Sequence, residues 1–263
     1  MLRIHDVTKT FFPGTVNERV ALDGLSLTLE AGDFVTVIGS NGAGKSTLMN
    51  AISGRIPADS GTIEIDGRSV GRLPDHRRAR FVGRVFQDPM AGTAPDLTIE
   101  QNLALALRRG RGRGLAMGVT RGRRELFRDE LRALELGLEN RLKARVGLLS
   151  GGQRQALSLL MASFTKPDIL LLDEHTAALD PQRAQLVTQL TKSIVERDGL
   201  TTLMVTHNME QALQLGNRLV MMHEGRIILE LDAQQKREAT VDTLLGEFAK
   251  IKGAVVDDRT LLG

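Results

Sequence analysis

Cysteine is absent from this chain of 263 residues. Disulfide bonds and thiolate metal sites are therefore excluded, and the composition is compatible with a reducing compartment such as the cytosol. Long apolar runs are also missing, because no window approaches the roughly 18 apolar residues of a membrane-spanning helix. The opening residues, MLRIHDVTKT, lack the charged-then-apolar layout of a secretion signal. Any role at a membrane is therefore expected to go through another chain.

Excess charge of one sign is small overall but locally concentrated. The net charge is only +3, so the composition does not compel nucleic-acid binding. One Gly-rich stretch nevertheless holds Arg108, Arg109, Arg111, Arg113, Arg121, Arg123 and Arg124. The favoured interpretation is a solvated loop near a protein partner, since no aromatic residue is interleaved for base stacking. Contact with RNA or with anionic lipid head groups is the alternative.

Hydrophobic periodicity predicts an α/β core with a helical insert in its middle. Strands are expected at 2–7, 20–30, 33–38, 62–66, 169–173 and 202–206, and helices at 45–53 and from about 181. Unbroken apolar runs such as 169–173 are typical of a parallel sheet covered on both faces. The pattern is helical between 88 and 166, with expected core positions at Leu103, Leu107, Leu126, Leu131, Leu134 and Leu138. The residues from about 231 are amphipathic and predict a helix docked on the core or on a partner.

The sharpest motif follows the apolar strand at 33–38. It reads Gly39-Ser40-Asn41-Gly42-Ala43-Gly44-Lys45-Ser46 and matches the phosphate-binding pattern G-x-x-x-x-G-K-[ST] in full. Glycines let backbone N–H groups converge on phosphate oxygens, and the positive end of the following helix points at the same place. Lys45 adds a full charge for the β- and γ-phosphates, and Ser46 offers its hydroxyl to Mg²⁺.

Two adjacent carboxylates follow the apolar residues 169–172: Asp173 ends the predicted strand, and Glu174 comes directly after it. Asp173 is expected beside the phosphate loop, where it would bind Mg²⁺ directly or through water. Glu174 projects differently and could polarise the attacking water. Together with the phosphate loop, this pair indicates nucleotide hydrolysis.

A second anion site follows from Ser150, Gly151 and Gly152, in the stretch Leu149-Ser150-Gly151-Gly152-Gln153-Arg154-Gln155. A serine hydroxyl and two glycine N–H groups at a helix start can bind phosphate. This stretch resembles the signature motif of the ABC ATPases and stands, as in that family, a short helix before the Asp-Glu strand. The resemblance implies that ATP is clamped between the phosphate loop of one copy and the signature, Gln153 included, of another.

Other positions resemble the family's functional residues, over roughly residues 2–230. Gln87 resembles the Q-loop glutamine, which senses Mg²⁺ and water. Asp180 in Ala178-Leu179-Asp180 resembles the D-loop, and His207 resembles the switch histidine that contacts the γ-phosphate. Phe11 matches the aromatic that stacks on adenine, with Phe12 as a competitor. Thr47 extends the phosphate loop. The family's usual proline after the glutamate is His175 here, a change that is expected to leave hydrolysis intact.

The family resemblance predicts a P-loop ABC nucleotide-binding domain with a RecA-like parallel-sheet core, an antiparallel β subdomain and a helical insert. The expected organisation is an ATPase domain at 1–230, with the helical subdomain at about 88–165, and a helical tail at 231–263. Phrases such as Gly83-Arg84-Val85-Phe86-Gln87-Asp88-Pro89-Met90 are similar to ATPase subunits of bacterial importers for tryptophan, tyrosine or related small solutes.

That likeness implies ATP and Mg²⁺ as cofactors and a cytoplasmic position on the inner face of the membrane. The implied partners are a second copy, membrane permease subunits and, indirectly, a substrate-binding protein, with no nucleic acid. An exporter ATPase stays open, because an ATPase sequence fixes direction poorly. A soluble ABC ATPase acting on nucleic acid is disfavoured, because the stretch between Ser46 and Leu149 leaves no room for a long coiled coil. A GTPase is disfavoured by the lack of an Asn-Lys-x-Asp motif.

Overall fold

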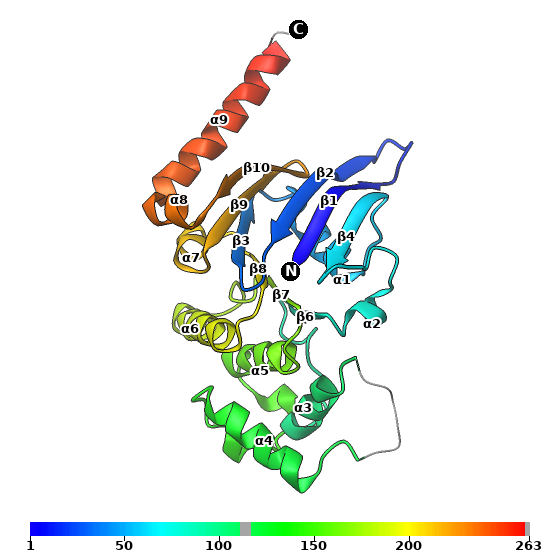
Figure 1. The fold of residues 1–263 in the computed structure, drawn as a ribbon. Coiled ribbons are helices and arrows are strands. Elements are labelled where there is room, and N and C mark those ends of the chain that lie inside the picture. Colours follow the sequence, from blue (N-terminus) through cyan, green and yellow to red (C-terminus); the bar gives the residue numbers. More distant parts are fainter. Residues whose placement is uncertain (111–116, 261–263) are drawn as a thin grey trace.

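Two β-sheets organise this computed structural model, which describes residues 1–110 and 117–260 (Figure 1). The smaller sheet is antiparallel with strand order β2-β1-β4-β5, and the larger has the order β10-β9-β3-β8-β7-β6. The larger sheet is parallel except for β10, which runs antiparallel to β9. The strands are β1 (Leu2–Phe11), β2 (Arg19–Leu29), β3 (Phe34–Gly39), β4 (Ser60–Ile65), β5 (Arg68–Ser69), β6 (Val82–Val85), β7 (Ile169–Asp173), β8 (Thr202–Val205), β9 (Arg218–His223) and β10 (Arg226–Leu231).

Helices cover the larger sheet and build a separate layer below it (Figure 1). They are α1 (Lys45–Ser53), α2 (Asp75–Arg78), α3 (Ile99–Leu107), α4 (Arg121–Arg132), α5 (Gly151–Ser163), α6 (Pro181–Asp198), α7 (Met209–Gln214), α8 (Ala233–Glu238) and α9 (Val241–Thr260), with short 3-10 turns at Leu138–Asn140 and Val146–Leu148. The described helices contain none that is long and apolar enough to cross a membrane.

The predicted α/β architecture is confirmed, and the expected strands and the helix at 45–53 are all present. The periodicity misses β5, β6, β9 and β10. Strand β6 is only four residues long and contains Gly83 and Arg84, so it lacks a clear apolar run. Strands β6 and β9 lie next to β7 and β3, which carry the motifs. The sequence therefore did not predict which strands flank the site.

Helix α1 lies in the core between the two sheets. Leu48, Met49 and Ile52 pack with apolar side chains of β1, β2 and β4 on one side and of β3, β7 and β8 on the other. This position fixes the loop before α1 at the carboxyl edge of the parallel strands. In such sheets, ligands bind at that edge.

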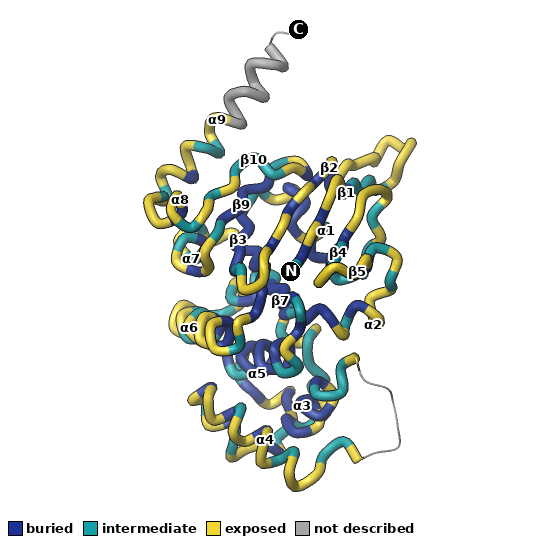
Figure 2. The backbone as a smooth tube through the Cα atoms, in the orientation of Figure 1, coloured by how far each residue is buried: buried dark blue, intermediate teal, exposed yellow. Residues whose placement is uncertain are grey.

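The helical insert shares one apolar core with the face of the large sheet that it covers. Helix α5 is its centre and is mostly buried, as its dark backbone in Figure 2 shows. The predicted core positions Leu103, Leu131, Leu134 and Leu138 are buried here, and Leu107 packs at the edge. Leu126 was predicted to be buried but is 41% exposed. The helix α4 turns Phe127 and Leu131 inward, and this leaves Leu126 on the solvent side.

Within the described residues, the arginine-rich stretch is only partly the solvated loop that was expected, because Arg121 is 96% exposed whereas two other arginines have internal partners. Arg121, Arg123 and Arg124 lie in α4, where Arg124 Nε donates to Glu100 at 2.7 Å. Arg109 donates to the carbonyls of Ala162 and Met161 at the end of α5, and burial lowers its pKa. The remaining residues of the stretch include Arg108 and, outside the described residues, Arg111 and Arg113. Composition alone suggested solvation, whereas helix packing gives Arg109 and Arg124 partners within the chain.

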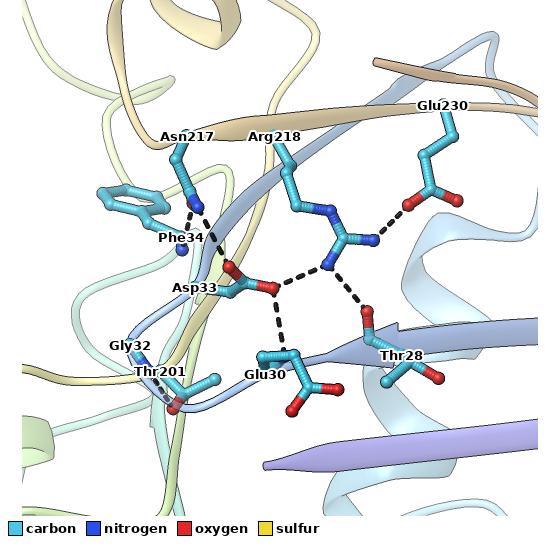
Figure 3. Close-up of polar contacts among 9 residues, drawn as sticks. All are labelled: Thr28, Glu30, Gly32, Asp33, Phe34, Thr201, Asn217, Arg218 and Glu230. Atoms are coloured by element: carbon cyan, nitrogen blue, oxygen red, sulfur yellow. Dashed lines mark hydrogen bonds and ion pairs between the residues drawn. The ribbon is translucent and has the colours of Figure 1, made fainter. Parts of the chain in front are cut away.

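A polar network joins the end of β2 to the starts of β3 and β9 (Figure 3). Arg218 donates to Asp33 Oδ2 at 2.6 Å and to the carbonyl of Thr28 at 2.9 Å, and it also pairs with Glu230. Asn217 donates to Asp33 Oδ1 and accepts from the backbone N–H of Phe34. The network ties both sheets together at the amino end of β3, opposite the phosphate loop.

The carboxyl-terminal segment docks on the core through a buried lysine and apolar side chains of α9. Lys236 of α8 is buried, and its ammonium donates to Thr36 Oγ1 and to the carbonyls of Leu215 and Arg218. Leu244 of α9 is fully buried against β9 and α7. We retain a boundary near residue 231 as a proposal, since β10 ends at Leu231 and the two helices follow it.

Candidate functional site

The loop between β3 and α1 is a turn that only glycines permit. Gly42 and Gly44 have positive φ values of 87° and 99°. A Cβ on Gly44 would lie 2.3 Å from the carbonyl oxygen of Ala21, and one on Gly39 would lie 2.3 Å from that of Met222. The loop is therefore pressed against β2 and β9, and its conformation needs residues without a side chain.

The amino end of α1 is left without a side-chain cap. Gly44 is its N-cap residue and makes no capping bond, whereas Thr98, Ser150 and Asp180 cap α3, α5 and α6 with their side chains. The first backbone N–H groups of a helix have no partner within the helix. At α1 these donors remain directed at the site, and this end of the helix favours an anion.

Lys45 spans the same loop from inside. Its ammonium donates to the carbonyl oxygens of Gly39 at 2.7 Å and Ser40 at 3.0 Å. Burial lowers the pKa of Lys45, and the nearby carboxylates of Glu174 and Asp173 oppose that effect. The ammonium is thus buried and bound to the carbonyls of the loop, next to the place where a phosphate would bind.

A cavity of about 270 Å³ opens between this loop and the β1–β2 hairpin. Phe11 and Arg19 are cross-strand partners in that hairpin, and both line the cavity. Arg19 also donates to the carbonyl of Gly42 at 2.9 Å. The full lining is Phe11, Arg19, Ala21, Asn41, Gly42, Ala43, Gly44, Lys45, Ser46, Thr47 and Glu174. An aromatic ring at one end and two cations near the loop fit a nucleotide base and its phosphates.

The phenylalanine next to Phe11 faces elsewhere. Phe12 is 66% exposed and has a positive φ of 52° at the start of the hairpin turn. Of the two aromatics, only Phe11 lines the cavity, and its stacking on a base stays a prediction.

The two carboxylates at the end of β7 point to different partners. Asp173 Oδ2 accepts from Arg84 Nη2 at 2.7 Å, whereas Glu174 Oε2 lies 3.3 Å from His207 Nδ1. Glu174 has a positive φ of 43°, which turns its side chain away from the strand direction and towards the cavity. The structure thus brings together Lys45, Glu174 and His207, which are far apart in the sequence.

The remaining predicted residues lie around this centre. Gln87 is exposed two residues after β6 ends. Ser150 caps α5, where it accepts from the N–H of Gln153 at 3.3 Å, and the side chain of Gln153 accepts from the N–H of Ser150 in return. Asp180 caps α6. A Cβ on Gly152 would lie 3.2 Å from the side chain of Arg183 in the first turn of α6, so the signature and the D-loop segment are neighbours within one chain.

His175 faces away from the cavity. Its ring is 2% exposed, and Nε2 lies 2.9 Å from Thr191 Oγ1 of α6. Burial lowers the pKa of His175 to about 4, so the imidazole is neutral near pH 7. The imidazole thus connects the turn after β7 to α6.

Two arginines of the site were missed from the sequence. Arg19 lines the cavity, and Arg84 contacts Asp173. Isolated arginines carry little signal in a sequence with many of them. An arginine inside a short apolar strand, as in Val82–Val85, was the one sign that could have marked Arg84.

The family described as ABC transporter matches residues 22–177, a stretch that includes the phosphate loop, the signature and the two carboxylates. The chain is a member of the ABC transporter ATPase family. It is 45% identical to a tyrosine transport ATP-binding protein of Clostridioides difficile, over 94% of this chain and 98% of that protein. It is 37% identical to the methionine import ATP-binding protein MetN of Rhizobium johnstonii over 88% of this chain, which spans 60% of that longer protein.

Solved ABC cassettes share the fold. A dimeric ATP-binding cassette in a post-hydrolysis state, bound to ADP and phosphate, superposes with a TM-score of 0.75. It is 32% identical and covers 89% of this chain and 99% of its own. A second dimeric structure of a bacterial ABC transporter cassette gives a TM-score of 0.73 at 30% identity, with the same shares of both chains. The chain is accordingly an ABC ATPase that binds and hydrolyses ATP.

Proposed function

We propose that this ABC ATPase powers uptake of tyrosine or a related small amino acid through a separate membrane permease. The observation that supports this substrate class is the 45% identity to a tyrosine transport ATP-binding protein along nearly the whole of both chains. The other importer relatives align less completely or less closely. A substrate-binding protein would deliver the amino acid to the permease, and this chain would sit on the inner face of the membrane.

In the proposed site, ATP occupies the cavity between Phe11 and the phosphate loop. Phe11 would stack on adenine. The backbone of residues 39–44, with Ser46, Thr47 and the uncapped start of α1, would bind the phosphates. The ammonium of Lys45 would move from the loop carbonyls that it contacts now to the β- and γ-phosphates. This exchange needs no large shift, because those carbonyls belong to the loop that surrounds the phosphates.

Magnesium would be held by oxygen donors near the phosphate loop. The hydroxyl of Ser46 and the carboxylate of Asp173 are hard oxygen donors of the kind that Mg²⁺ prefers, and Gln87 could add its amide oxygen. Among the described residues no group of three or more His, Asp or Glu side chains could hold a metal alone. This suits a Mg²⁺ that needs phosphate oxygens to complete its coordination.

Glu174 is proposed as the general base for the attacking water. Its carboxylate borders the cavity, and His207 lies 3.3 Å away, where it can orient that carboxylate or contact the terminal phosphate. Arg84 neutralises the neighbouring Asp173, so the two carboxylates differ in environment. This difference favours Glu174 as the proton acceptor and Asp173 as the metal ligand.

A second copy would complete the site. The cavity lining comes from β1, β2, the phosphate loop, α1 and Glu174, whereas Ser150, Gly151 and Gly152 lie at the start of α5 in the helical subdomain. A head-to-tail pair would bring the signature of each copy, with Gln153 and Asp180 nearby, onto the ATP of the other. The dimeric cassettes among the solved relatives support this arrangement.

The composite site is tested by mixing two defective variants. Lys45→Ala destroys the phosphate loop and keeps the signature, whereas Ser150→Arg blocks the signature and keeps the loop. Each homodimer then has two defective sites. A mixed dimer has one doubly defective site and one intact site, so mixing should partly restore ATP-dependent dimerisation in light scattering. Adding Glu174→Gln to both copies should hold the restored site closed. Failure of the mixture to dimerise would refute sharing between copies.

The direction and substrate are tested by uptake. Cells that lack this chain should lose accumulation of labelled tyrosine, and the wild-type chain, but not Glu174→Gln, should restore it. A Nod factor export ATP-binding protein, 38% identical over 81% of this chain, keeps the exporter as the second candidate. Unchanged tyrosine uptake together with slower efflux of a solute would favour that alternative.

A further inference from the structure

Arg84 connects three elements of the site through one guanidinium group. Nη2 donates to Asp173 Oδ2 at 2.7 Å, and Nη1 donates to Asn50 Oδ1 at 2.7 Å and to Ser53 Oγ at 3.1 Å. Asn50 and Ser53 belong to α1, the helix that follows the phosphate loop, and Asp173 ends β7. Arg84 itself lies in β6, which leads directly to Gln87.

The contact is buried and geometrically constrained. The side chain of Arg84 is 9% exposed and that of Asp173 is 16% exposed. Strands β6 and β7 are adjacent and parallel, with Arg84 opposite Leu171, so the guanidinium reaches two residues along β7 to the carboxylate. The ring of Phe86 stacks at 4.9 Å from the guanidinium carbon. A planar donor group fixed from several sides holds its acceptor in one rotamer.

This arrangement divides the two oxygens of Asp173. Oδ2 is taken by Arg84, which leaves Oδ1 as the oxygen for a cation beside the phosphate loop. The adjacent carboxylate, Glu174, is directed instead to His207. Without Arg84, two neighbouring half-buried carboxylates would repel each other, and Asp173 would be free to rotate away from the loop. Mutation of a partner that orients a metal-binding carboxylate typically costs about 10–100-fold in metal affinity.

We propose that Arg84 is a positioning residue for Asp173 and thereby sets how strongly Mg²⁺ contributes to nucleotide binding. The proposal rests on the proposed function, in which Asp173 is a Mg²⁺ ligand. Arg84 does not touch nucleotide or metal and acts only through the carboxylate. A simple structural ion pair between β6 and β7 is the competing explanation, and it predicts no specific effect on the metal.

The test compares nucleotide affinity with and without the metal. Binding of a fluorescent ATP analogue is measured in excess Mg²⁺ and in EDTA, and the ratio of the two dissociation constants reports the contribution of the metal. Arg84→Met removes the cation but keeps a side chain of similar length, so the ratio should fall by roughly tenfold while metal-free affinity stays near wild type. Arg84→Lys should lower the ratio less than Arg84→Met, because an ammonium still pairs with Asp173 although it cannot hold Asn50 as well.

Three controls separate the possible failures. Arg55→Met removes a second guanidinium, whose carbon lies 5.8 Å from the centroid of the same Phe86 ring, and this exposed residue should leave the ratio unchanged. Asp173→Asn should lower the ratio, and adding Arg84→Met to it should lower the ratio no further, because Arg84 acts through that carboxylate. Thermal unfolding confirms that each variant is folded. If Arg84→Met does not fold, the ratio measured for Arg84→Lys in Mg²⁺ and in EDTA tests the proposal instead.

Each outcome has one meaning. A wild-type ratio in the folded Arg84 variants, with a lowered ratio in Asp173→Asn, overturns the positioning role and leaves the proposed function intact. An equal loss of affinity with and without Mg²⁺ in the Arg84 variants also overturns it, in favour of a structural ion pair. A wild-type ratio in Asp173→Asn refutes the metal-ligand role of Asp173 in the proposed function.

Discussion

The neutral histidine after the proposed base should make the folded protein sensitive to acid. His175 is buried, and its Nε2 lies 2.9 Å from Thr191 Oγ1. The Thr191 hydroxyl already donates to the carbonyl of Val187 at 2.8 Å, so its oxygen accepts a hydrogen bond from Nε2–H. The ring is thus the neutral tautomer protonated at Nε2. A second proton would place an unpaired charge in the core.

The sign and size of the effect follow from the two pKa values. Burial lowers the pKa of His175 from 6.5 to about 4, whereas the unfolded chain keeps the ordinary value. Between these values the unfolded state binds the proton and the folded state does not, so stability is complete above pH 6.5 and is lost as pH falls towards 4. The loss from this one group is about 2 kcal/mol at pH 5 and approaches about 3 kcal/mol at lower pH.

The prediction is checked with His175→Gln, which cannot titrate but keeps an N–H donor. Urea unfolding of both proteins at pH 7.5 and pH 5 gives four free energies of unfolding. Contributions from all other groups cancel in the difference between the proteins, so the wild type should lose about 2 kcal/mol more than the variant. ATPase activity of the variant at pH 7.5 should stay close to wild type, because the ring faces α6. Equal losses in both proteins would refute the buried neutral imidazole, and lost activity would indicate a role in hydrolysis.

Three further predictions concern the cavity itself. Glu174→Gln should keep ATP binding and stop hydrolysis, since an amide cannot accept the proton of the water. Phosphate release measures the hydrolysis, and normal turnover would place the base elsewhere. Phe11→Ala should weaken ATP binding by about 1–3 kcal/mol in a fluorescence titration, whereas the exposed Phe12→Ala should not, and the reverse result would exchange their roles. Gly199→Ala meets no atom within 4 Å and should cost only the left-handed backbone strain of about 1–2 kcal/mol in urea unfolding. Gly44→Ala adds a clash with a backbone oxygen at 2.3 Å and should cost clearly more as well as abolish nucleotide binding; equal costs would contradict the tight loop.

Local sequence determined the family, the motif residues and much of the secondary structure. The phosphate loop needs residues that are contiguous, so its glycines, Lys45 and the start of α1 can be read directly from the chain. The same holds for the Asp-Glu pair and for the cap formed by Ser150 and Gln153. The apolar runs of β3, β7 and β8 are not interrupted by an arginine or an internal glycine, so they can be recognised as central strands.

Tertiary structure alone decided which distant side chains meet. Arg84 and Asp173 are 89 residues apart and become partners only because β6 lies next to β7 in the sheet. Leu126 has the right spacing for a core residue but lies on the outer side of α4. Arg109 and Arg124 seemed to be solvated charges and instead bond to α5 and to Glu100. Periodicity reports which residue types recur, whereas burial and pairing depend on the order of strands and the faces of helices, and these are fixed by the packing of the whole chain.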